Sequence, residues 1–232
     1  TDNNGCQDTA SASIVQPDSI SNTFNSDSVL CFEGSDGSLT ANPTGGTSGY
    51  SYSWGTGDTT ATISSQTAGS YTVTISDAHN CINTFTGIIE EPTELTSSTF
   101  KIQDVSCFGG SNGAAYVSAN GGIPTYDFAW SNGVTTDTNS TLMQGLAFVT
   151  ITDNNGCTKV DSIQIDEPAI LAGNVTIDSQ VTCFGYSNGT ATANPTGGTS
   201  PYSYLWSNGE DTQQADSLLV GSHTVTITDS LG

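Results

Sequence analysis

Basic side chains are almost absent from this sequence. Lys101 and Lys159 stand against 23 acidic residues in a chain of 232, and the formal charge is -21 at pH 7. Binding to nucleic-acid phosphates or to an anionic membrane surface needs clustered cations. The composition therefore argues against nucleic acids and membranes as partners, and it favours the attraction of cations.

Long apolar runs and helical periodicity are missing as well. No stretch approaches the roughly 20 apolar residues that span a membrane, and no window has a helical period. The chain also starts without a methionine or a signal peptide, so we expect a mature product or an excerpt of a longer protein. Six cysteines in a Lys-poor chain rich in Thr, Ser, Gly and Asn indicate an oxidising, extracellular setting.

One segment occurs three times along the chain. In each copy, aromatic residues alternate with small or polar ones and lead into a Gly-containing turn, which is typical of a half-buried strand. The copies occupy residues 49–57, 125–133 and 201–209, and their tryptophans are Trp54, Trp130 and Trp206. The tryptophans are 76 residues apart in both steps, which identifies an internal repeat. We expect all three to lie in the cores of small sheet pairs.

The other apolar runs of each repeat are short and are bounded by Gly, Pro, Asn or Asp, as antiparallel strands require. The sequence therefore predicts an all-β protein of tandem β-sandwich repeats, about 76 residues each, in a linear array. The expected repeats are residues 18–92, 93–168 and 169–232. Residues 1–17 are expected to be the final strand of a preceding repeat or of a neighbouring subunit's repeat.

The two ends of the chain complement each other. Residues 1–17 match residues 152–168, which end the second repeat, whereas the third repeat stops before residue 233, where the register would place its next cysteine. We therefore expect the third sandwich to lack its last strand. Two explanations are open: the chain is a window of a longer array, or separate copies join head to tail by donating residues 1–17 to a neighbour.

Several spaced motifs recur together in the chain. The third repeat has Cys-Phe-Gly-x-Ser-Asn-Gly at residues 183–189, Gly-Gly-Thr-Ser-Pro-Tyr-Ser-Tyr-x-Trp-Ser-Asn-Gly at residues 197–209 and Thr-Val-Thr-Ile-Thr-Asp from residue 224. With these motifs the chain resembles the SprB repeat family of large surface adhesins in Bacteroidota. The resemblance implies PKD-like and immunoglobulin-like sandwiches in a secreted cell-surface or filament-forming protein, in some members tied to gliding and attachment.

One feature departs from a shared pattern among the repeats. Ala147 and His223 stand where the first repeat has Tyr71. A tyrosine corner, in which a tyrosine hydroxyl bonds to the backbone a few residues upstream, therefore cannot be common to all three repeats at this position.

The six cysteines allow three pairings that respect the repeat. They are Cys31–Cys81 with Cys107–Cys157, within repeats; Cys6–Cys31, Cys81–Cys107 and Cys157–Cys183, across linkers; and Cys31–Cys157, between the first turn of one repeat and the last turn of the next. We favour the first, because a small sandwich benefits from its own staple. Cys6 and Cys183 would then find partners outside the chain.

The sequence gives little support for a catalytic site. His79 lies beside a turn, and His223 occupies an alternating strand position where other residues also fit, so neither is placed as a base for a nucleophile. The paired acids at residues 90–91 and 166–167 precede prolines. We interpret them as solvated strand ends, since nothing concave in the pattern surrounds them.

Metal binding has one set of candidates, the aspartates that recur at the last turn of each repeat: Asp77, Asp153 and Asp229. The surrounding turn lacks the alternating ligand spacing of a calcium loop, so a turn-capping role is favoured. Loose recruitment of Ca²⁺ by the acidic charge at repeat junctions is the one cofactor hypothesis.

Modification of hydroxyl groups is the better chemical prediction. Asp followed by Ser or Thr and then an apolar residue or Thr resembles the O-glycan acceptor motif of Bacteroidota. The candidate acceptors are Thr9, Ser19, Ser28, Thr59, Ser162, Ser217 and Ser230. Three Asn-x-Ser/Thr sequons, at Asn139, Asn174 and Asn188, rank lower.

The sequence thus predicts a structural protein without catalysis, either the shaft of a cell-surface adhesin or an extracellular filament. The alternative is a glycan-binding adhesive module that recognises a surface polysaccharide. Burial of Tyr and Trp in every repeat favours the first, because a glycan platform needs exposed aromatic rings.

Overall fold

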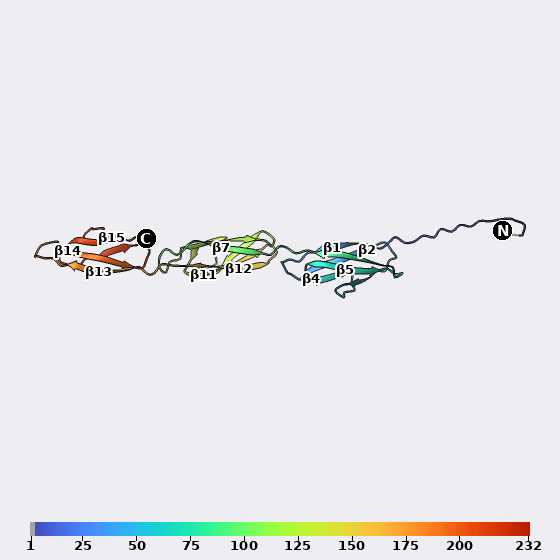
Figure 1. The fold of residues 1–232 in the computed structure, drawn as a ribbon, viewed down its shortest axis with the longest axis horizontal. Coiled ribbons are helices and arrows are strands. Elements are labelled where there is room, and N and C mark those ends of the chain that lie inside the picture. The colour runs from blue at the N-terminus through green and yellow to red at the C-terminus, as the bar shows by residue number, and fades with distance from the viewer. Residues whose placement is uncertain (1–2) are drawn as a thin grey trace. The chain divides into compact units, whose positions relative to one another are not determined.

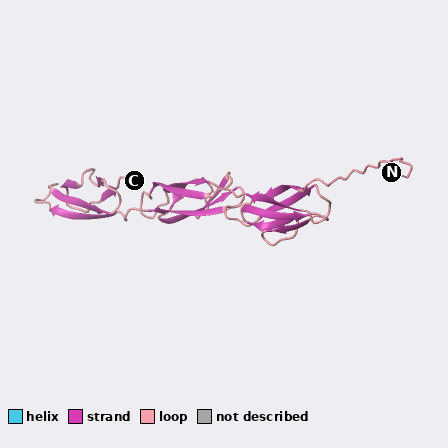
Figure 2. Cartoon of the chain, turned by 45° about the vertical axis from the view of Figure 1, so that its right-hand side comes forward, coloured by secondary structure: helices cyan, strands magenta, loops and turns pink. Residues whose placement is uncertain are grey.

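The structure is a computed structural model that describes residues 3–232, so Thr1 and Asp2 lie outside it. Residues 3–232 form 17 strands and no helix (Figures 1 and 2). No helix in this part of the chain is long and apolar enough to cross a membrane. The all-β prediction is confirmed. The chain divides into two compact units, Thr1–Glu94 and Leu95–Gly232.

The first unit holds one β-sandwich of six antiparallel strands. Its sheets have the strand orders β1-β2-β4 and β3-β5-β6. The strands are β1 (Ser21–Asp27), β2 (Gly37–Thr44), β3 (Ser51–Trp54), β4 (Thr62–Gln66), β5 (Gly69–Ser76) and β6 (Ile82–Ile89).

The second unit holds two further β-sandwiches, each made of two sheets. The second sandwich has the strand orders β10-β8-β7 and β12-β11-β9, and the third has β13-β14-β16 with a two-stranded sheet, β15-β17. The strands of the second are β7 (Thr96–Gln103), β8 (Gly113–Asn120), β9 (Tyr126–Trp130), β10 (Thr138–Leu142), β11 (Gly145–Asp153) and β12 (Thr158–Ile165). Those of the third are β13 (Ala172–Ser179), β14 (Gly189–Thr196), β15 (Ser203–Trp206), β16 (Gln214–Leu218) and β17 (Val225–Thr228).

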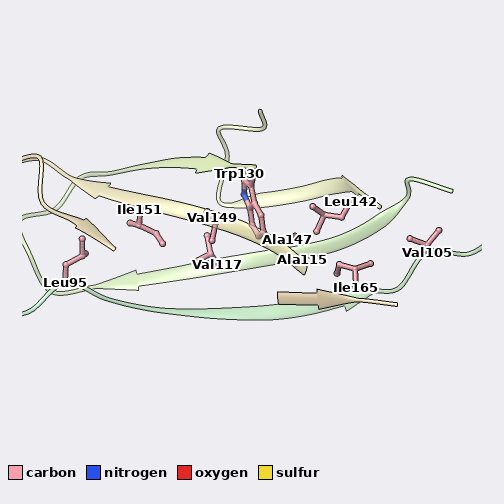
Figure 3. Packing of buried hydrophobic residues seen from close by; sticks show 10 residues of the cluster. All are labelled: Leu95, Val105, Ala115, Val117, Trp130, Leu142, Ala147, Val149, Ile151 and Ile165. Atoms are coloured by element: carbon pink, nitrogen blue, oxygen red, sulfur yellow. The ribbon is translucent and has the colours of Figure 1, made fainter. Parts of the chain in front are cut away.

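Alternating side chains from the two sheets of each sandwich build its core. Figure 3 shows this packing in the second sandwich, where Trp130 and Val149 come from paired neighbouring strands. The three tryptophans are only 2–3% exposed, and each pairs across its sheet with a valine. The period of two that marks the aromatic segments thus places one face of each strand inside.

The third core is smaller than the other two. Val225 and Ile227 on β17 are half-buried, whereas their equivalents on β11, Val149 and Ile151, are fully buried. The β17 strand pairs only with β15, so no strand within the described residues covers these side chains from the other side. Within residues 3–232, the third sandwich thus has five strands where each of the other two has six.

Residues 3–17 form no strand in this structure, and their assignment to a preceding or neighbouring repeat stays a prediction. These residues have no strand partner, and every side chain from Asn3 to Ser19 is exposed. The physical reason is that an isolated segment gains neither ladder hydrogen bonds nor a buried face to offset the entropy of ordering it.

Candidate functional site

One buried aspartate in each sandwich holds two loops together. These residues are Asp77, Asp153 and Asp229. In the second sandwich, the Oδ2 atom of Asp153 accepts the N–H of Ile123 at 2.8 Å, and Oδ1 accepts the N–H groups of Asn155 and Cys157, both at 2.9 Å. The carboxylate thereby ties the turn after β8 to the turn after β11.

The same arrangement recurs in the other two sandwiches. Asp77 accepts from the backbone of Thr47, His79 and Cys81, and Asp229 accepts from Thr199, Leu231 and Gly232, all within 2.9–3.1 Å. This arrangement, in which one aspartate accepts N–H groups from two turns, is called the aspartate clamp below. It requires glycine in the turn that faces the carboxylate. Gly122 has φ of 57°, and a Cβ there would lie 2.4 Å from Asp153 Oδ2.

The clamp shifts the ionisation of the aspartates. Burial by itself raises the pKa of Asp153, but four backbone N–H donors, chiefly that of Ile123, outweigh it and hold the pKa below its usual range. The N–H of Thr47 has the largest part in lowering the pKa of Asp77, and that of Thr199 has the same part for Asp229. Each carboxylate is therefore charged where the fold needs an acceptor.

The same geometry bears on the metal hypothesis. Both oxygens of each clamp aspartate already accept backbone N–H groups. Among residues 3–232 no group of three or more His, Cys, Asp or Glu side chains is placed to hold a metal ion. The clamp aspartates act as turn caps, the role that their turn sequences favour.

In every sandwich, one tyrosine and one tryptophan each donate a hydrogen bond to a loop carbonyl oxygen. The tyrosine hydroxyl donates to the carbonyl oxygen of a turn glycine five residues earlier, and the tryptophan Nε1 donates to a threonine carbonyl oxygen six residues later. The pairs are Tyr50–Gly45, Tyr126–Gly121, Tyr202–Gly197, Trp54–Thr60, Trp130–Thr136 and Trp206–Thr212. The aromatic body is packed in the core while its polar tip fixes a loop.

The two histidines have local roles. His223 Nε2 lies 3.0 Å from the carbonyl oxygen of Leu219, four residues earlier, just as the hydroxyl of Tyr71 donates to Thr67. Histidine thus replaces tyrosine at this corner, which sequence reasoning did not anticipate. His79 Nδ1 lies 2.9 Å from Thr47 Oγ1 in the clamped turn.

The acids before the prolines are exposed or half-buried strand ends, and two of them also accept a backbone N–H from a neighbouring loop. Glu91 Oε2 accepts the N–H of Glu33 at 2.8 Å, and Glu167 Oε2 accepts that of Gly109 at 2.7 Å. Asp166 accepts from Lys101 Nζ at 2.9 Å. The signal that could have found the first two is their identical spacing, 58 residues after a Gly-containing turn.

The bonding state of the cysteines differs from the within-repeat pairing that the sequence favours. Cys31 and Cys157 are disulfide-bonded, whereas Cys81, Cys107 and Cys183 carry free thiols. The pairs Cys31–Cys81 and Cys107–Cys157 are therefore wrong, and so are the pairs across the linkers. This bonding state agrees with the third predicted pairing, Cys31–Cys157.

Strand length explains why the within-repeat pair cannot form. The N–H of Val29 donates to the carbonyl oxygen of Glu90, so the loop that carries Cys31 lies at the end of β6. Cys81 precedes the start of β6, which is eight residues long. Eight strand residues span about 26 Å, far more than the roughly 7 Å between Cα atoms that a disulfide can bridge.

The glycosylation candidates separate by exposure. Six of the seven O-linked candidates are exposed, and only Ser162, on β12, is half-buried. Asn174 and Asn188 are exposed, but Asn139 is completely buried and donates to Asn132 Oδ1 at 2.8 Å. N-glycosylation at Asn139 is therefore wrong, since a buried amide cannot carry a glycan. Modification at the exposed hydroxyls stays a prediction.

A comparison with protein families finds one match in each of the three repeats. The SprB repeat family matches residues 23–59, 99–135 and 176–211. The chain carries three SprB repeats. Each match begins in the first strand of a sandwich and ends in the loop after its tryptophan strand. A comparison with curated protein sequences finds no match. SprB repeats belong to cell-surface proteins, and a disulfide is in keeping with that location.

Solved structures with similar folds come from several sources. The three N-terminal domains of the outer capsid protein Hoc from bacteriophage RB49 are 19% identical, with a TM-score of 0.43 over 82% of this chain and 75% of that one. Extracellular domains 3–5 of Drosophila OTK are 13% identical, with a TM-score of 0.26 over 94% and 93%. The sandwich assignment itself rests on the strands and cores described above.

Disulfide mapping checks the cysteine state. After blocking free thiols without reductant and digesting with pepsin, we expect a peptide containing Cys31 joined to one containing Cys157. Cys81, Cys107 and Cys183 should carry the blocking group. A joined peptide that contains Cys31 and Cys81 would contradict the structure.

The aspartate clamp makes stability depend on pH. Because the folded pKa of Asp153 is lowered, its contribution is fully present above the usual value of about 3.9 and is lost as pH falls through the folded value. Asp153→Asn should lower the unfolding free energy at pH 7 by about 1–3 kcal/mol and flatten its fall below about pH 4. Chemical denaturation measures both. Asp127→Asn, at an exposed strand position, is the control, and an equal effect there would refute the clamp.

Proposed function

We propose that the chain is a load-bearing shaft segment of an extracellular adhesin or filament, without turnover. One observation carries the proposal. The first and last strands of each complete sandwich lie side by side although they belong to different sheets. The SprB repeats and the disulfide support an extracellular, cell-surface setting.

Side-chain hydrogen bonds link these two strands. In the second sandwich, Thr99 Oγ1 donates to the carbonyl oxygen of Ser162 at 3.0 Å, and Ser97 Oγ donates to Asp161 Oδ2 at 2.9 Å. In the first sandwich, Ser26 Oγ donates to the carbonyl oxygen of Ile88 at 2.8 Å. Residue numbers rise together along the linked strands, so the first and last strands run in the same direction.

Parallel terminal strands suit a sandwich that bears load. The chain enters at the start of the first strand and leaves at the end of the last, at the opposite end of the sandwich. A pull on both ends therefore shears the two strands along each other. The hydrogen bonds that link the two strands and the contacts of the buried core then resist the shear together, instead of breaking one after another.

A cross-link between repeats would add to this resistance. We extend the proposal to the bond Cys31–Cys157, the option that the cysteine state fits. A related contact occurs within the second unit. The thiol of Cys107, which corresponds to Cys31, lies 3.3 Å from the carbonyl oxygen of Gly232. By the repeat, Gly232 corresponds to Gly156, the residue before Cys157.

Single-molecule pulling on the full chain tests the proposal. We expect discrete force peaks, and we expect reductant to lengthen the fully extended chain. The loop closed by Cys31–Cys157 holds 126 residues, roughly 440 Å at about 3.5 Å per residue. Cys31→Ser should remove the effect of reductant, whereas Cys81→Ser, at a free thiol, should keep it. Extension without force peaks would sink the load-bearing function, and an unchanged length would sink only the cross-link.

One observation favours the glycan-binding alternative. The rings of Phe100 and Tyr116 stack on the surface of the second sandwich, with centroids 4.8 Å apart and planes at 14°, and they are 45% and 40% exposed. Such a platform suits a sugar ring. Binding on a glycan array that Phe100→Ser abolishes and Phe148→Ser preserves would promote this function, since Phe148 is 47% exposed elsewhere on the sandwich.

A further inference from the structure

The solvent face of one sheet differs between the three sandwiches. At the same place in this sheet, the first two strands of each sandwich carry a cross-strand pair of side chains on the face opposite the core. The pairs are Asn25–Thr40 in the first sandwich, Phe100–Tyr116 in the second and Thr176–Thr192 in the third. Polar residues thus suffice for the fold at this place, and only the second pair is aromatic.

Alternation along the strand shows that these rings do not fill the core. Ala115 and Val117, on either side of Tyr116 in sequence, are 0% and 3% exposed and belong to the core. Tyr116 and its partner Phe100 therefore project from the opposite face, where their rings stack on each other. Exposed aromatic surface that the fold does not use is typical of a binding site.

Hydroxyl groups surround the two rings. Thr138 lies beside Tyr116 on the next strand, and Ser98 and Ser118 form the following cross-strand pair on the same face. We call these five residues, Ser98, Phe100, Tyr116, Ser118 and Thr138, the aromatic face. All five are exposed, and within residues 3–232 no side-chain hydroxyl of the aromatic face is hydrogen-bonded to another protein group.

The matching hydroxyl groups of the other two sandwiches are already engaged. In the first sandwich, Thr40 Oγ1 lies 2.9 Å from Thr62 Oγ1. In the third, Asp178 Oδ2 accepts from Thr192 Oγ1 at 2.6 Å and from Gln214 Nε2 at 3.0 Å. The polar groups there satisfy one another, whereas those of the aromatic face are available to a ligand.

The aromatic face is also neutral at pH 7, although the chain has a formal charge of -21. Lys101, next to Phe100 in sequence, is held by Asp104 and Asp166, whose oxygens lie 2.7 and 2.9 Å from its Nζ atom. A cationic ligand would find no carboxylate on this face, and the acidic chain would repel an anionic one. The chemistry therefore fits a neutral ligand that is rich in hydroxyl groups.

A sugar ring meets both requirements. The C–H groups on one side of a pyranose carry partial positive charge, which the electron-rich face of an aromatic ring attracts. Because β7 is an edge strand, the Phe100 ring has Tyr116 stacked on one side and no strand of its own sheet on the other. One side of the Phe100 ring is therefore open to stacking.

We propose that the aromatic face binds a neutral hexopyranose unit of a polysaccharide, with the sugar ring stacked on Phe100 and its hydroxyls bonded to those around the two rings. The inference rests on the glycan-binding function named above, and it adds the place of the site, on one repeat of three, and the class of sugar. It is independent of the load-bearing function. Because the face is flat and open, the affinity for one unit is on the order of 1 mM.

Exchange of residues between repeats tests the inference in the full chain. The double variant Phe100→Asn with Tyr116→Thr gives the second sandwich the pair of the first, which that fold already accepts. NMR titration with neutral hexasaccharides of glucose, mannose or galactose should show one site in the wild type and at least a tenfold loss of affinity in this variant. Phe148→Thr, which introduces the residue that the first sandwich has on its other sheet, should bind as the wild type does.

The reverse exchange supplies the second measurement. Asn25→Phe with Thr40→Tyr should create a second site on the first sandwich, so that two sugars bind per chain. Hexasaccharides of uronic acids should bind at least tenfold more weakly than neutral ones at low salt, because the chain is acidic.

The outcomes separate the site from the function. Three results would overturn the inference and leave glycan binding standing: sugar binding that survives the loss of both rings, a first sandwich that stays inert with both rings in place, or equal binding of uronic acids. No binding of any oligosaccharide would overturn the glycan-binding function as well.

Discussion

Each complete sandwich is closed by one contact, in which an isoleucine near the end of the last strand packs over a glycine at the start of the second strand. Ile89 over Gly37 and Ile165 over Gly113 are too close to admit even a methyl group on the glycine. The contact joins the two sheets at one end of the core. At the equivalent Gly189, the nearest atoms belong to Leu218 and Val181.

The loops at the sandwich ends follow a second rule, namely that buried polar groups are satisfied by backbone partners. The clamp aspartates accept N–H groups, and the tyrosine and tryptophan tips donate to carbonyl oxygens. These side chains are fully engaged in holding turns, so the polar groups that recur in every repeat support the fold. Rigid ends and parallel terminal strands together suit a protein that transmits force.

Much of this arrangement could be predicted from local sequence. The strands, the buried tryptophans and the turn-capping role of Asp77 follow from alternation and from turn chemistry, which depend on residues close together in the chain. The N–H contacts of Glu91 and Glu167 were not predicted, because their partners lie in turns 58 residues earlier that only the fold brings alongside. The sequon at Asn139 failed for a similar reason, since its amide lies on the inner face of β10.

The sequence by itself determined the repeat, the all-β class and the residues that form the cores, because a period of two fixes which side chains share a face. Only the tertiary structure decided the cysteine state and the backbone contacts of Glu91 and Glu167. Both depend on which strand ends meet in space. An eight-residue strand carries Cys81 to the far end of the sandwich from Cys31, and the turn at Glu33 lies beside Glu91 although 58 residues separate them.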